Sequence, residues 1–108
     1  MLTISTQKIY IYHGSVNLHR SFEGLSSLVE TSFPSKLLSG SLFVFVNSRK
    51  NKLKLLYWDN DGLAIWYKRL EKGTFRVGKN GKTEFTRREF LMLLEGIKPR
   101  RLNSRFSL

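Results

Sequence analysis

The amino-acid sequence predicts an α+β fold, an antiparallel sheet of five or six strands with two helices packed on it. Several short segments alternate apolar residues with a period of two, which is typical of strands. Two other segments space apolar residues three and four positions apart, which is typical of amphipathic helices. The chain has 108 residues, of which 41% are hydrophobic, so it can form one packed core.

A strand and a helix are the first elements expected. Residues 8–13 alternate isoleucine with tyrosine, which predicts a strand. Ser21 can cap a helix near residues 21–33, and Pro34 ends it because proline has no amide hydrogen. The apolar residues of this segment share one helical face: Phe22, Leu25, Leu28, Val29 and Phe33.

Three strands are expected in the middle of the chain. Residues 41–48 are apolar on both faces, which predicts a central strand. Residues 52–58 and 63–70 follow, and residues 59–62, Asp-Asn-Asp-Gly, are a strong turn signal between them.

A last hairpin is predicted from residues 74–77 and 82–85. A three-residue loop at residues 79–81 would place Phe75 opposite Phe85, which keeps apolar residues on one face. A two-residue loop would mix core and solvent faces, so we prefer the longer loop.

The second helix has a clear start signal. Thr86 and Glu89 form a capping box, in which each side chain bonds to the backbone amide of the other residue. The helix is expected over residues 87–95, where Gly96 can end it. Its buried residues are expected to be Phe90, Leu91, Leu93 and Leu94.

Composition indicates one cytoplasmic domain. Residues 1–98 are expected to form a single globular unit, and residues 99–108 a mobile basic tail without a core pattern. Cysteine is absent, which excludes disulfides and thiolate metal sites. We expect no signal peptide in residues 1–14, and the apolar runs are too short to span a bilayer.

Charge points to a polyanionic partner. The formal net charge is +11, and residues 49–88 carry twelve basic residues against four acidic ones. A field of this sign attracts nucleic acid, although a solvated basic surface without a partner is the alternative. Membrane binding is not expected, because no helix combines a basic face with a long apolar one. The residues expected to contact DNA are Arg49, Lys50, Lys52, Lys54, Lys68, Arg69, Lys72, Arg100 and Arg101.

Catalytic chemistry finds little support in the sequence. Asp59 and Asp61 could bind a metal ion only with a further carboxylate, of which Glu71 is the nearest, so we interpret residues 59–62 as a turn. The two histidines, His13 and His19, have no nucleophile-and-acid pattern around them. We therefore expect no enzyme activity, no cofactor, no metal and no small-molecule substrate.

Aromatic residues alternate with cations in the middle strands. Such side chains can stack on bases and pair with phosphates, or they can form core beneath a solvated rim. We interpret most of them as core, because a small domain needs large side chains inside. They are Tyr57, Trp58, Trp66 and Tyr67, beside Lys52, Lys54, Lys68 and Arg69.

A family pattern runs collinearly over about residues 8–98, in segments 22–25, 42–45, 58–63, 67–75 and 93–97. Its most specific residues are Trp58, Asp59, Asp61, Gly62, Tyr67, Lys68, Arg69 and Glu71. In these segments the chain resembles the second-frame accessory protein, often called TnpB, of the insertion-sequence-sixty-six transposons. The resemblance implies a role in transposition beside a separate transposase that carries the catalytic carboxylates.

The resemblance has one clear departure. Family members usually read Asp-Met-Arg-Lys-Gly before the first phenylalanine, whereas residues 17–21 read Asn-Leu-His-Arg-Ser here. Three functions remain open. The chain is a DNA-binding accessory factor at transposon ends, an adaptor that binds the transposase with little DNA contact, or a metal-dependent nuclease using Asp59 and Asp61.

Overall fold

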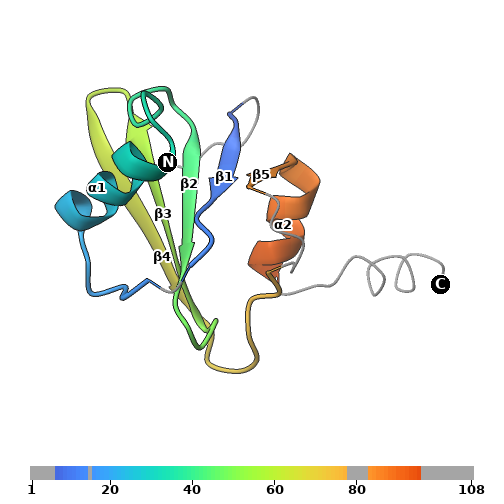
Figure 1. Cartoon of the computed structure of the whole chain (residues 1–108). Coiled ribbons are helices and arrows are strands. Elements are labelled where there is room, and N and C mark those ends of the chain that lie inside the picture. Colours follow the sequence, from blue (N-terminus) through green and yellow to red (C-terminus); the bar gives the residue numbers. More distant parts are fainter. Residues whose placement is uncertain (1–6, 15, 78–82, 96–108) are drawn as a thin grey trace.

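The computed structural model describes residues 7–14, 16–77 and 83–95. A five-stranded sheet in the order β4-β3-β2-β1-β5 carries α1 on one face and α2 on the other (Figure 1). The α+β class and the two helices are confirmed, and the described residues form five strands. The elements are β1 (Ile9–Ile11), α1 (Phe22–Ser32), β2 (Leu42–Val46), β3 (Lys52–Asp59), β4 (Gly62–Arg69), β5 (Glu84–Phe85) and α2 (Arg87–Glu95).

One pair of neighbouring strands is parallel. β1 and β2 run in the same direction, with Ile9 opposite Leu42, whereas the other neighbouring pairs are antiparallel. The expectation of a wholly antiparallel sheet is therefore wrong at this pair. The cause is the connection between the two strands, which contains α1. A helical crossover returns the chain to the end of the sheet at which β1 began, so β2 starts from the same end and runs parallel to β1.

The hairpin expected from residues 74–77 and 82–85 is wrong. Residues 74–77 form no strand. Phe85 lies opposite Ile9 of β1, where β5 closes one edge of the sheet, and not opposite Phe75. The strand pairing that local turn signals suggested is thus replaced by a pairing between distant parts of the chain.

Backbone hydrogen bonds explain this replacement. The outer edge of β1 needs acceptors for its amides, and Ile11 N–H donates to the Thr83 carbonyl at 2.8 Å. Phe75 N–H instead donates to the Lys50 carbonyl at 2.7 Å, and the Phe75 side chain is buried. The loop expected at residues 79–81 lies outside the described residues.

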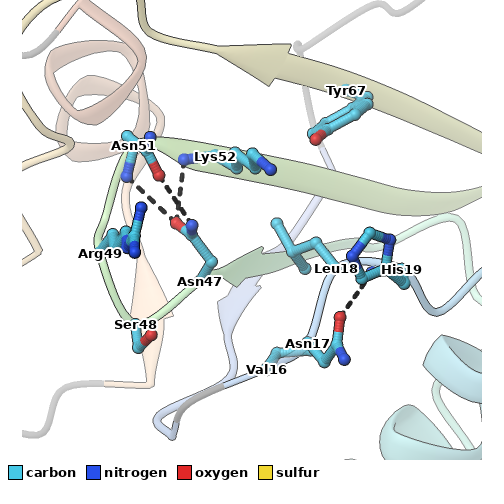
Figure 2. Close-up of a pocket in the computed structure, with 10 residues that line it drawn as sticks. All are labelled: Val16, Asn17, Leu18, His19, Asn47, Ser48, Arg49, Asn51, Lys52 and Tyr67. Carbon is cyan, nitrogen blue, oxygen red and sulfur yellow. Dashed lines mark hydrogen bonds between the residues drawn. The ribbon is translucent and has the colours of Figure 1, made fainter.

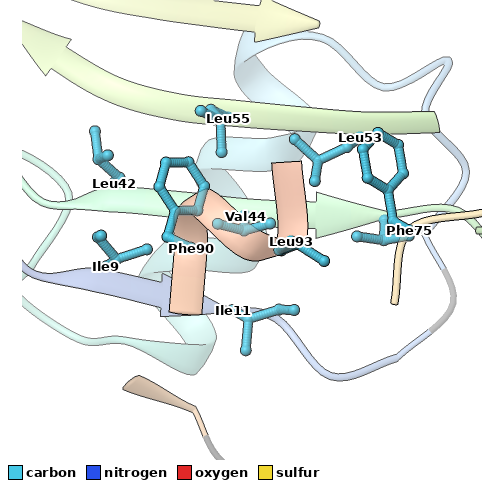
Figure 3. Close-up of a cluster of buried hydrophobic side chains, with 10 residues drawn as sticks. Ile9, Ile11, Leu42, Val44, Leu53, Leu55, Phe75, Phe90 and Leu93 are labelled. Carbon is cyan, nitrogen blue, oxygen red and sulfur yellow. The ribbon is translucent and has the colours of Figure 1, made fainter. Parts of the chain in front are cut away.

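Each face of the sheet has its own apolar cluster. Figure 3 shows the cluster beneath α2. Successive side chains along a strand point to opposite faces of the sheet, so every second residue of β1, β2 and β3 belongs to this cluster. The cluster consists of Ile9, Ile11, Leu42, Val44, Val46, Leu53, Leu55, Phe75, Phe90 and Leu93. The cluster beneath α1 consists of Val16, Leu18, Leu25, Val29, Phe43, Phe45 and Leu56.

The two helices begin differently. In α2 the capping box is confirmed: Glu89 N–H donates to Thr86 Oγ1 at 3.1 Å, and Thr86 N–H donates to Glu89 Oε1 at 2.9 Å. In α1 the hydroxyl of Ser21 makes no capping bond, and only its carbonyl accepts from the helix. Met92, and not Leu91, completes the buried face of α2, and the expected stop at Gly96 lies outside the described residues.

The capping box makes a testable contribution to stability. We expect Thr86→Ala to lower the free energy of unfolding by about 1 kcal/mol, because an amide of the first helical turn loses its acceptor. Urea denaturation followed by circular dichroism measures the change. Thr74→Ala is the control, since that exposed side chain has no hydrogen bond within the described residues. Equal unfolding midpoints for the two variants would contradict the assignment.

Candidate nucleic-acid interface

The register of β3 and β4 places several predicted DNA contacts together. Lys52 lies opposite Arg69, and Lys54 lies opposite Tyr67. Because directly opposed residues of an antiparallel pair share a face and every second residue along a strand does too, these four side chains lie on the α1 face. Three of the nine expected contacts therefore form one cationic group around an aromatic ring.

Lys68 lies on the other face of the sheet. It is opposite Leu53, whose side chain is buried in the cluster beneath α2. The Lys68 ammonium donates to the carbonyl of Leu94 in α2 at 3.4 Å. Lys68 is thus the member of the expected set that the strand register separates from the group on the α1 face.

The turn between β2 and β3 presents Arg49 and Lys50, and the side chain of Asn47 holds it. Asn47 Oδ1 accepts from the amides of Asn51 and Lys52 at 3.1 and 2.9 Å, and Asn47 Nδ2 donates to Asn51 Oδ1 at 2.7 Å. Lys50 takes a left-handed φ of 59°, and its amide donates to the Asn47 carbonyl at 3.0 Å. These bonds give the turn one defined conformation.

Two further backbone bonds attach this turn to the segment that follows β4. Leu70 N–H donates to the Asn51 carbonyl at 2.8 Å, and Phe75 N–H donates to the Lys50 carbonyl at 2.7 Å. Figure 1 shows the turn and this segment at the same end of the sheet. Lys72, which lies in that segment and is exposed, is therefore near the same end as Arg49. Arg100 and Arg101 lie outside the described residues.

A cavity of about 470 Å³ opens at this end, on the α1 face (Figure 2). Its walls come from the loop before α1, from the β2–β3 turn with the first residue of β3, and from β4. None of its lining residues is acidic. The lining residues are Val16, Asn17, Leu18, His19, Asn47, Ser48, Arg49, Asn51, Lys52 and Tyr67.

The loop before α1 is built around Asn17. Asn17 Oδ1 accepts from the amide of His19 at 2.9 Å, and its carbonyl accepts from the amide of Arg20 at 3.1 Å. Lys54 Nζ donates to the Arg20 carbonyl at 2.9 Å and lies 5.1 Å from the centre of the Tyr67 ring. Lys54 therefore joins this loop to the two strands. This loop coincides with residues 17–21, where the sequence departs from the family pattern.

Five polar cavity residues were neither expected contacts nor part of the family motif: Asn17, His19, Asn47, Ser48 and Asn51. The sequence signal for Asn47 and Asn51 is their position at strand ends, where asparagine favours turns. Tyr67 is one of the four aromatic residues that we interpreted for the most part as core, but it is in neither apolar cluster, since 50% of its surface is exposed. Tyr57 and Trp66 do pack against the α2-side cluster, in agreement with the interpretation as core.

We call the part of the sheet and turn that carries Arg49, Lys50, Lys52, Lys54 and Arg69 the basic end. Few acidic side chains compensate its positive charge. Among the described residues, Arg69 has an acidic partner, Glu71 at 2.9 Å, and both side chains are exposed. An exposed pair of this kind is screened by solvent. No carboxylate is paired with Arg49, Lys50, Lys52, Lys54 or Lys72 in the described part of the chain.

Asp59 and Asp61 lie at the opposite end of the hairpin. Asp59 is seven positions from Lys52 on the same strand, which corresponds to about 24 Å of extended chain. This separation exceeds the Debye length of about 8 Å at physiological ionic strength, so these carboxylates do not neutralise the basic end. Burial raises the pKa of the Tyr57 phenol, and the nearby charge of Asp59 raises it further.

The turn interpretation of residues 59–62 is confirmed. Asn60 has a left-handed φ of 58°, and Asp61 N–H donates to the Asp59 carbonyl at 2.6 Å. Glu71 does not join Asp59 and Asp61, because it follows Arg69 at the other end of β4. No three histidine, aspartate or glutamate side chains lie close enough together to hold a metal ion in the described residues, 7–14, 16–77 and 83–95. Within the same ranges, no helix has the length and apolarity needed to cross a bilayer.

Comparison with known families shows to which protein family the chain belongs. Residues 7–104 match the family model described as IS66 Orf2 like protein. The chain belongs to this family. The resemblance seen in the sequence is thereby confirmed, and the IS66 family associates the chain with transposition in an accessory role.

Two relatives from Sinorhizobium fredii (strain NBRC 101917 / NGR234) are named as uncharacterized proteins. y4jC is 30% identical over 92 residues, which cover 83% of this chain and 79% of y4jC. y4hO is 27% identical over 92 residues, which cover 83% of this chain and 80% of y4hO. No solved structure matches this IS66-family chain.

The Asn47 bonds predict a stability effect at the basic end. Asn47→Ala should lower the free energy of unfolding by about 2 kcal/mol, because two turn amides lose their acceptor. Asn47→Asp keeps an acceptor oxygen at that position, so its loss should be clearly smaller. Urea denaturation of the three proteins measures both effects. The assignment would be refuted by equal losses in the alanine and aspartate variants.

Proposed function

We propose that this IS66-family protein is a cytoplasmic, non-catalytic accessory factor that binds DNA through its basic end beside a separate transposase. The observation that carries the proposal is the register of β3 and β4. It sets Lys52, Lys54 and Arg69 on one face, next to the turn that presents Arg49 and Lys50. Nucleic-acid phosphates are the polyanion that such a group fits best.

The opposition of Lys52 and Arg69 supports an anionic ligand. Like charges directly opposite each other on neighbouring strands destabilise a sheet. Arg69 has its nearest relief in the exposed carboxylate of Glu71, whereas Lys52 has no acidic partner among the described residues. A bound phosphate between Lys52 and Arg69 would offset their repulsion. The repulsion lowers the stability of the free protein, and its removal on binding favours the complex.

The remaining basic residues extend the proposed contact surface. Lys72 lies in the segment that is bonded to the β2–β3 turn, and Lys68 lies on the other face of the edge strand β4. A duplex that lies across the end of the sheet would reach both. Arg100 and Arg101 are proposed to add contacts from the basic tail.

Duplex DNA binding should depend steeply on salt and little on sequence. With about four to six phosphate contacts, affinity should fall roughly hundredfold to thousandfold between 50 and 200 mM salt, because bound phosphates release counterions. The double variant Lys52→Glu, Lys54→Glu should bind more weakly, with a salt slope shallower by about two contacts. Fluorescence anisotropy with a labelled duplex at several salt concentrations measures both quantities.

A variant of equal charge change is the control for this experiment. Arg87→Glu with Arg88→Glu lies at the exposed start of α2, on the other side of the sheet, where acidic residues suit the helix dipole. It should retain most of the affinity if the basic end is the site. Equal losses in the two double variants would mean that net charge alone attracts DNA. No binding by the unaltered protein at low salt would reject the proposal.

The single variant Lys52→Glu separates function from stability. Glutamate at this position would face Arg69 across the strands and replace a repulsive pair by an attractive one. We expect the free energy of unfolding to rise by about 0.5 kcal/mol while DNA affinity falls. Chemical denaturation and anisotropy on the same preparations test this. A variant that loses both stability and affinity would contradict the idea that the Lys52–Arg69 opposition is retained for binding.

The second candidate function is an adaptor that binds the transposase with little DNA contact. One observation favours it: β4 is an edge strand of eight residues, to which an extended segment of another protein can add. A pull-down of the cognate transposase with and without nuclease treatment distinguishes the functions. Capture that survives complete removal of DNA would support the adaptor.

A further inference from the structure

The cavity beside Tyr67 has features of a ligand site that a flat basic surface would lack. Its volume of about 470 Å³ is within the range of small-ligand pockets. Its lining includes the buried apolar side chains of Val16 and Leu18, the cations Arg49 and Lys52, and the phenol ring of Tyr67 (Figure 2). Apolar surface, an aromatic plane and cations are together the chemistry that binds one nucleotide, since a base is flat and its phosphate is anionic.

The Tyr67 ring is held in position before any ligand arrives. Its strand partner Lys54 places an ammonium 5.1 Å from the ring centre, and the same ammonium donates to the Arg20 carbonyl. Lys54 is not among the residues that line the cavity, whereas Tyr67 is. The ring therefore has a cation against it from the strand pair and still contributes surface to the cavity, with half of its area exposed to solvent.

Hydrogen-bond donors around the cavity are available. Among the described residues, the Arg49 guanidinium and the Lys52 ammonium have no hydrogen-bond or ion-pair partner. The side chains of Asn17 and Asn51 accept through Oδ1, and their Nδ2 groups donate to no other group in residues 7–14, 16–77 and 83–95. Cations suit phosphates, and amides suit the edges of unpaired bases.

We propose that this cavity holds one unpaired nucleotide of a DNA single strand. The base lies on the Tyr67 ring, and Arg49 and Lys52 bind the adjacent phosphates. A base inside a duplex is stacked and paired, so it cannot enter the cavity without leaving the helix. The inference rests on the proposed function, since the same basic end binds the strand, and it adds a preference for unpaired DNA at one defined place.

The test compares three labelled DNA probes of equal length, roughly ten nucleotides each. They are a single strand, an abasic strand with the same phosphates but without bases, and a duplex. Tyr67→Ala should weaken binding of the single strand about fivefold to hundredfold, because base stacking on an aromatic ring is lost. It should leave the abasic strand and the duplex within twofold of the unaltered protein.

Two control variants define the cause of any loss. Tyr67→Phe keeps the ring and should retain the single-strand affinity. Phe22→Ala removes an aromatic side chain of similar exposure, 46% against 50%, that does not line the cavity, and it should have no effect. The abasic probe also reports folding, because a misfolded variant would lose all three probes together.

Several results would overturn the inference. One is equal affinity of the unaltered protein for the single and abasic strands, and another is an unchanged ratio of the two in Tyr67→Ala. Free deoxynucleoside monophosphate that binds as tightly as the strand would assign the cavity to a free nucleotide and not to a strand. In these three cases salt-dependent duplex binding would survive. Loss of the proposed function itself would instead appear as no binding of any probe.

Discussion

The pairing register of β3 and β4 determines where every charge and ring of the hairpin lies. Side chains alternate between the faces, so a shift of β3 by one residue would turn Lys52 and Lys54 toward the core beneath α2. It would also expose Leu53 and Leu55, which are fully buried. Exposing these buried leucines would cost much free energy, because apolar surface would return to water. The burial of the leucines therefore fixes the face on which Lys52 and Lys54 lie.

The α1 face changes character along the hairpin because helix cover ends. The pair Leu56–Ile65 packs beneath α1 in the apolar cluster, and the next pair on that face is Lys54–Tyr67. Lys54 bonds to the carbonyl of Arg20, which precedes the N-cap residue Ser21 of the helix. The start of α1 therefore lies at the level of Lys54, the first cation on this face of β3 beyond the apolar cluster. The cavity lies beyond this point. It is bounded by the β2–β3 turn, which Asn47 holds, and by the loop before α1, which Asn17 and the buried side chains of Val16 and Leu18 hold.

Local signals in the sequence predicted those parts of the fold that depend on neighbours in the chain. The Thr86 capping box and the Asn60 turn are such cases, since both involve residues within a few positions. The parallel β1–β2 pair and the contact of Phe85 with Ile9 depend on distant segments and were not predictable from local patterns. The cavity was missed for the same reason, because its walls are assembled only by the tertiary fold.

The residues that carry the family resemblance have two structural roles that depend on each other. Asp59, Asp61 and Gly62 form the turn of the hairpin, while Tyr67, Arg69 and Glu71 lie at or beyond its other end. A hairpin turn sets the register of the strands that it joins. The turn thus decides that Tyr67 faces Lys54 and that Arg69 faces Lys52. Acidic residues about 24 Å from the basic end can therefore be essential to its geometry without taking part in its electrostatics.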